Sequence, residues 1–137
     1  MIKLFYKAVL MKKDIENRED IYLLVKEFYV KLMNDDLMHH FFEDFSNPIL
    51  LESHLQTLVD FWDNVIFYSG EYRKNAMEPH LKLQQTKPFS SKHFKSWLSM
   101  FNSTVDELFE GDNAHAAKSR ALSIATVMEI KISSLNK

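Results

Sequence analysis

Glycine and proline are scarce in this sequence, and their scarcity limits the possible folds more than any other feature. The chain of 137 residues has two glycines and three prolines, whereas 46% of its residues are hydrophobic and 13% are aromatic. Sandwiches and barrels need closely spaced turns, which use glycine and proline. The length suits one domain with a hydrophobic core. We therefore expect a single all-α domain built from long helices.

Four stretches of the sequence repeat apolar residues at helical spacing. They cover residues 17–34, 47–70, 90–110 and 112–132, and a shorter apolar piece at residues 37–42 suits one or two helical turns. Residues that favour helix N-caps precede each long stretch. The expected caps are Asn17, Asn47, Ser90 or Ser91, and Asp112 or Asn113. Gly70 favours a C-cap for the second helix.

The composition excludes several classes of protein. A formal net charge of -2 with both signs interspersed gives no basic surface for nucleic acid. The absence of cysteine excludes disulfides, zinc–thiolate sites, iron–sulfur clusters and thiol catalysis. Apolar runs in residues 1–16 are too short for a signal core or a membrane span. We therefore expect a soluble, cytoplasmic protein with no nucleic-acid or membrane partner.

Residues 1–16 precede the first long helix. They have no clear role in the sequence pattern, so we interpret them as an N-terminal extension or a short helix. The single domain is accordingly assigned to residues 17–137.

Common metal and catalytic motifs are missing as well. No two of the six histidines have the i, i+4 spacing of a helical zinc site, and no Glu-x-x-His sequence is present for a carboxylate-bridged di-iron site. Two glycines cannot build phosphate-binding or dinucleotide-binding loops. What remains is a concentration of aromatic residues, with His54 on the second long helix and His80 after an irregular stretch. A haem needs an axial imidazole and an apolar slot, but spacing alone does not establish one, and a surface or core role stays open for each histidine.

Several motifs nevertheless occur in an order that resembles one family. They are Phe28-Tyr29, residues 37–41, His54-x-x-x-Leu58-x-x-Phe61-Trp62, Gly70-x-Tyr72, Pro79-His80-Leu81-x-Leu83, His93-Phe94-x-x-Trp97-Leu98-x-x-Phe101 and Arg120-Ala121-x-x-Ile124-Ala125. Over roughly residues 20–132 the chain resembles the truncated haemoglobins, most closely their third group. That group characteristically lacks the glycine-rich helix-end motifs of the other two, and they are lacking here.

The resemblance implies a two-over-two helical sandwich, the truncated globin fold, around haem b. It implies that His80 is the proximal ligand to the haem iron. Phe41 matches the aromatic residue that wedges against the haem, and the neighbouring Phe42 leaves a shift of one residue open. Tyr72 and Trp62 fall at haem-contacting positions, Trp62 as packing at the haem edge.

On the distal side, the resemblance gives Tyr29 and Trp97 as hydrogen-bond donors to a bound diatomic ligand. A buried tyrosine hydroxyl or indole N–H normally needs such a partner. His54 and Leu58 lie one turn apart and line the ligand pocket, where His54 could also gate entry. The other histidines match no site position, and we expect them on the surface: His39, His40, His93 and His115.

The function implied by the resemblance is binding of dioxygen, nitric oxide or a related diatomic ligand. Two donors favour retention and use of the ligand, so nitric oxide or peroxide chemistry of dioxygenase or peroxidase type is the first hypothesis. Any turnover would need electrons from a separate reductase. Ligand binding without turnover, for sensing or delivery, is the alternative, and a haem-free helical interaction module is the third.

Overall fold

Helices are the regular structure of the part that the computed structural model describes, residues 12–68 and 89–135. The elements in chain order are α2 (Arg18–Asn34), the 3-10 segment η1 (His39–Ser46), α3 (Pro48–Phe67), α5 (Ser91–Leu108) and α6 (Asp112–Leu135). The expected all-α class is confirmed. Within these residues no helix has the combination of length and apolar character that a membrane span requires.

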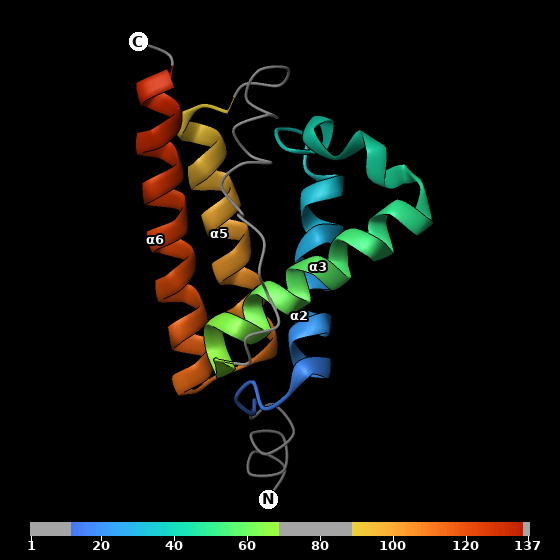
Figure 1. Cartoon of the computed structure of the whole chain (residues 1–137), viewed down its shortest axis with the longest axis vertical. Helices are drawn as coiled ribbons and strands as arrows, with labels where there is room; N and C mark the ends of the chain where they lie inside the picture. Colours follow the sequence, from blue (N-terminus) through green and yellow to red (C-terminus); the bar gives the residue numbers. More distant parts are fainter. Residues whose placement is uncertain (1–11, 69–88, 136–137) are drawn as a thin grey trace, which may run out of the picture.

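The four long helices form two pairs. Helices α2 and α3 pack on each other, as do α5 and α6, and the pairs touch through α2 with α5 and α3 with α6. Figure 1 shows α5 and α6 running antiparallel side by side, with α3 crossing α2 at a steep angle. This arrangement is the expected two-over-two sandwich.

Three of the expected helix starts are confirmed by their capping geometry. The Asn17 side chain accepts a hydrogen bond from the backbone N–H of Asp20, and the Asn47 side chain accepts from Ile49 and Leu50. Ser90 is the cap of α5. Each cap satisfies backbone donors that the first turn of a helix leaves without a partner.

On α2 the buried face is the one that helical spacing predicts, whereas on α3 the buried residues are Leu55, Val59, Trp62 and Ile66. Every apolar residue expected on the inner face of the first long helix is buried: Ile21, Leu24, Val25, Phe28, Tyr29 and Leu32. In α6 the corresponding inner face is built from alanines at Ala117, Ala121 and Ala125. Alanine has almost no side chain, so α6 can approach its neighbours closely.

The N-terminal cap of α6 differs from the expectation that Asp112 or Asn113 provides it. The carboxylate of Asp14 accepts hydrogen bonds from the backbone N–H groups of Asn113 and Ala114, at 2.9 and 2.8 Å. Next to Asp14, the side chain of Ile15 is fully buried in the core. The sequence pattern predicted a cap next to the helix, whereas the acceptor lies about a hundred residues earlier in the chain.

Gly111 makes room for this long-range cap. Its φ of 146° lies in a region that L side chains rarely adopt. A Cβ atom at this position would also collide with the carboxyl group of Asp14. A glycine is therefore required at the turn between α5 and α6.

Helix α3 ends slightly earlier than expected. Its last residue is Phe67, and Tyr68 takes the left-handed conformation with φ 55°, its N–H bonded to the carbonyl of Asn64. A left-handed residue commonly ends a helix, and here a tyrosine takes the role assigned to Gly70. Gly70 itself lies outside the described residues.

Candidate functional site

Tyr29 and His54 meet between α2 and α3. The Tyr29 hydroxyl lies 2.8 Å from Nε2 of His54, a hydrogen bond between two helices that cross. Tyr29 is 8% exposed, whereas His54 is half-buried. Burial raises the pKa of the Tyr29 phenol well above its usual value. The phenol carries its proton at neutral pH, as an ordinary tyrosine does, and burial disfavours its loss further.

Two phenylalanines of η1 complete what we call the aromatic cluster: Tyr29, Phe42, Phe45 and His54. The Phe45 ring is stacked on the His54 imidazole, with centroids 4.5 Å apart and planes at 20°. Phe42 stands edge-on to Tyr29 at 5.4 Å and stacks with Phe45 at 6.3 Å. The cluster thus has one hydrogen-bonding pair enclosed by apolar rings.

Trp97 approaches the same region from α5. Its ring lies edge-on to Phe28 at 5.6 Å and parallel to Phe101 at 5.8 Å. Phe28 also touches Tyr29, edge-on at 5.9 Å. Tyr29 and Trp97, the two expected donors, therefore pack against the same phenylalanine.

Leu58 and Trp62 of α3 differ in burial. Leu58 is half-buried, on the side of the helix that carries His54. Trp62 is 5% exposed and stacks on Phe101 at 4.9 Å, so it packs in the core between α3 and α5. The Phe101 ring therefore covers one face of the Trp62 indole.

Phe41 points away from Tyr29 and packs at the start of α5. It stacks on Phe89 with centroids 4.2 Å apart and contacts His93 edge-on at 5.0 Å. Of the two adjacent phenylalanines, Phe42 is the one that contacts Tyr29. The kink at Phe42, with φ -120° and ψ 22°, separates the directions of the two rings.

The expectation of a surface position for His93 is wrong. His93 is 9% exposed, and its Nδ1 accepts a hydrogen bond from the backbone N–H of Ser90 at 2.8 Å. Burial, with the nearby charges of His40 and Lys92, lowers the pKa of His93. The imidazole completes a capping box from the third helical position, a role usually taken by Glu or Gln, which is why the sequence pattern did not reveal it. His39 and His115 are exposed as expected, and His40 is half-buried.

Two expected site residues, Tyr72 and His80, lie outside the described residues. Within residues 12–68 and 89–135, no three His, Cys, Asp or Glu side chains gather closely enough to hold a metal ion. The donor set that is described suits a small polar ligand in an apolar setting, with one phenol and one imidazole among aromatic rings.

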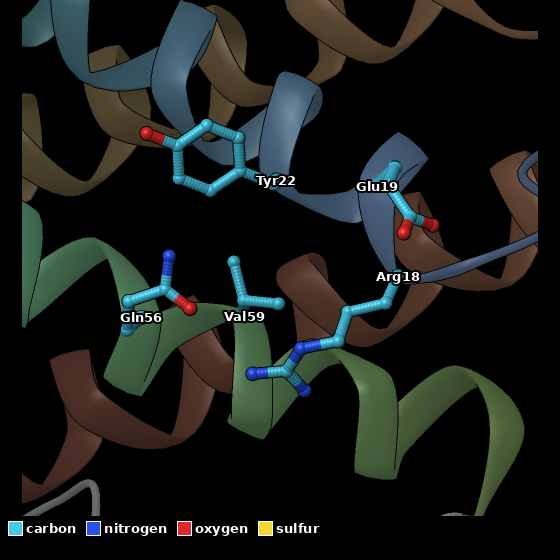
Figure 2. A pocket seen from close by; sticks show the side chains of 5 residues that line it. All are labelled: Arg18, Glu19, Tyr22, Gln56 and Val59. Carbon is cyan, nitrogen blue, oxygen red and sulfur yellow. The ribbon is translucent and has the colours of Figure 1, made fainter.

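A surface hollow between α2 and α3 is separate from the aromatic cluster. Figure 2 shows its lining residues Arg18, Glu19, Tyr22, Gln56 and Val59. Arg18 forms an ion pair with Asp60, and the Tyr22 hydroxyl donates to Glu52 at 2.8 Å. These polar groups already have partners within the protein, and none of the expected site residues lines the hollow.

Sequence reasoning missed Phe45 and Phe89. Neither residue lies on a long helix: Phe45 belongs to the 3-10 segment, and Phe89 precedes α5. Helical spacing therefore gave no indication of where their rings point. The only available signal was the density of phenylalanine at residues 41–45.

No family model matches the chain, but a known protein and a solved structure are similar to it. The Group 3 truncated hemoglobin ctb of Campylobacter jejuni is 25% identical over 118 residues, which cover 85% of this chain and 91% of that protein. A crystal structure of group III truncated hemoglobin from Campylobacter jejuni superposes with a TM-score of 0.80 and 23% identity, covering 89% of this chain and 95% of that one. The chain thus has the fold of a truncated haemoglobin and, over most of its length, a sequence similar to the third group of that family.

Proposed function

We propose that this protein binds haem b through His80 and binds a diatomic ligand, dioxygen or nitric oxide, beside Tyr29. The observation that carries the proposal is the hydrogen bond between the buried Tyr29 hydroxyl and His54, enclosed by apolar rings. The named relative and the similar structure, both truncated hemoglobins, support it. A haem supplies an iron centre that takes up a diatomic ligand and exchanges electrons.

Tyr29 would act on the ligand through its hydroxyl proton. The phenol is neutral at physiological pH and burial disfavours the phenolate further, so its hydroxyl proton is available for donation. When His54 accepts at Nε2, the proton points toward His54; when His54 donates from Nε2, the proton of Tyr29 is free for the ligand. His54 can therefore set the direction in which Tyr29 donates.

The remaining residues would shape the haem site. His54 and Leu58 lie on one half-buried face of α3, with Phe61 and Val65 continuing that face. Trp97 would supply a second donor through its indole N–H, and Phe41 or Phe42 would pack against the haem. Tyr72 and Trp62 would contact its edge.

For the reaction, we propose oxidation of nitric oxide or reduction of peroxide, with electrons from a separate reductase. Hydrogen-bond donors beside the ligand retain it and stabilise negative charge that develops on it. Ligand retention of this kind suits chemistry better than rapid release. We propose a cytoplasmic location.

The test is the absorption spectrum of the purified protein, followed by reaction of the oxygenated ferrous form with nitric oxide. We expect a strong Soret band, lost in His80→Ala and kept in the matched variant His115→Ala, whose histidine is exposed on α6. Haem retained by His80→Ala would overturn the ligand assignment. Rapid conversion to the ferric form by nitric oxide supports oxidation chemistry, whereas a sluggish reaction supports ligand binding without turnover.

A further inference from the structure

The imidazole of His54 makes two contacts, a hydrogen bond at its edge and a ring stack on its face. Nε2 bonds to the Tyr29 hydroxyl at 2.8 Å, with the two rings inclined at 61°. The Phe45 ring covers the face of the imidazole at a centroid distance of 4.5 Å and an angle of 20°. The hydrogen bond orients one ring atom, and the stack fixes the ring plane. Together they favour the inward arrangement of the imidazole.

Phe45 is itself supported by its neighbours in the aromatic cluster. Phe42 stacks with it at 6.3 Å and 27°, and Tyr29 lies edge-on to it at 6.2 Å and 60°. Segment η1 packs against both α2 and α3. Phe45 is therefore a packed ring, able to restrain the histidine that it covers.

His54 is more exposed than the phenol to which it bonds. It is half-buried, as Phe42 and Phe45 are, whereas Tyr29 is 8% exposed. Moving His54 outward would break both the stack and the hydrogen bond. Loss of one aromatic stack corresponds to roughly a two- to tenfold change in the population of the inward arrangement.

We propose that Phe45 is a positioning residue that holds His54 against Tyr29 and thereby sets how fast a small ligand reaches the phenol. The proposal rests on the proposed ligand-binding function and deepens it. Phe45 acts through His54 and does not itself touch the ligand. Its removal opens the path without removing a hydrogen-bond donor.

The kinetic test is carbon monoxide rebinding after flash photolysis of the haem-loaded protein. Phe45→Leu is expected to speed bimolecular rebinding roughly two- to tenfold. In a His54→Ala background the same substitution is expected to have no further effect, because the residue that it restrains is absent. Phe109→Leu, a buried phenylalanine near Lys13, is the matched control and should leave the rate unchanged. An unchanged rate in Phe45→Leu, or full additivity with His54→Ala, would overturn the proposal.

The structural test is the NMR resonance of the His54 Cε1–H proton, assigned by its loss in His54→Ala. Stacking on Phe45 places this proton in the ring current, so it is expected upfield in the native protein and to move downfield in Phe45→Leu. Phe45→Tyr keeps the ring and should restore both the shift and the rebinding rate; Phe45→Met serves if the leucine variant does not fold. A native resonance without a ring-current shift would overturn the stacking. Lack of a Soret band in the native protein would refute the proposed function instead.

Discussion

Burial gives Tyr29 a chemistry that its sequence position alone does not. A phenol on the surface exchanges its proton with water, whereas the phenol of Tyr29 is enclosed by Phe42 and Phe45 and bonds to one imidazole. A tyrosine is already neutral over the physiological range, and the raised pKa of Tyr29 disfavours its ionisation further. The hydroxyl proton of Tyr29 therefore has few possible acceptors, of which the His54 imidazole is one.

Removing the hydroxyl group of Tyr29 should shorten the lifetime of the bound ligand. Tyr29→Phe keeps the ring and is expected to raise the dioxygen dissociation rate roughly tenfold, the effect of losing one charge-assisted hydrogen bond. Stopped-flow displacement of dioxygen by carbon monoxide measures the rate. Tyr22→Phe is the matched control, because the Tyr22 hydroxyl bonds to Glu52 at the surface. Equal rates in Tyr29→Phe and the native protein would contradict the role of Tyr29.

Spacing and resemblance together predicted much of this site, and they did so where residues lie on regular helices. Spacing predicted the helices that carry Tyr29 and His54, the resemblance gave both as pocket residues, and the structure brings the two side chains into contact. Phe45 was not expected, because the direction of a ring on a kinked 3-10 segment depends on backbone angles that no short motif encodes. His93 was misplaced for a related reason: a histidine in a capping box has no common sequence signature.

At the scale of elements, the N-terminus of α6 depends on a distant acceptor. Burial raises the pKa of the Asp14 carboxyl, but hydrogen bonds from the backbone N–H groups of Asn113, Ala114 and Ile15 outweigh that effect, and the net pKa is lowered. The carboxylate also meets the positive end of the helix dipole. Helix boundaries were predictable from spacing, whereas this partner was not, since no local pattern links Asp14 to α6.

Asp14→Ala should therefore destabilise the protein. We expect a loss of about 1 kcal/mol in the free energy of unfolding, as for other helix caps. Urea unfolding followed by circular dichroism at pH 7 measures it, with Asp112→Ala as the matched control in the same helix turn. If Asp112→Ala costs as much as Asp14→Ala, the long-range cap is not the dominant one.

The loss of unfolding free energy in Asp14→Ala should also depend on pH. The folded pKa of Asp14 lies below its ordinary value of 3.8, so its contribution is fully present above pH 3.8 and is lost as the pH falls through the folded value. The difference in unfolding free energy between the native protein and Asp14→Ala should therefore shrink in acid. A difference that grows in acid would contradict this sign.

At the scale of the molecule, one side chain joins three of the four long helices. Phe101 of α5 is fully buried and contacts Phe28 of α2 at 5.2 Å and Trp62 of α3 at 4.9 Å. The buried face of α2 was predictable from helical spacing, but the choice of Phe101 as the meeting point was not. It results from the angles at which the helices cross.

Phe101→Leu should accordingly destabilise the whole domain rather than one helix. We expect a loss of about 1 to 2 kcal/mol in the free energy of unfolding, because leucine leaves part of the ring volume empty. The midpoints of thermal unfolding, measured by circular dichroism and by tryptophan fluorescence, should fall by the same amount. Phe67→Leu, at a half-buried position, is the control and should shift less. Separate transitions for the two signals would contradict a single cooperative core.

The hydrogen bonds of Asp14 also bear on the order in which the molecule can be made. A ribosome releases Asp14 about a hundred residues before Ala114, its partner. The contact between them therefore has a high sequence separation, and it cannot form until synthesis has reached the start of α6. During synthesis, the first turn of α6 thus meets an acceptor that was made long before it.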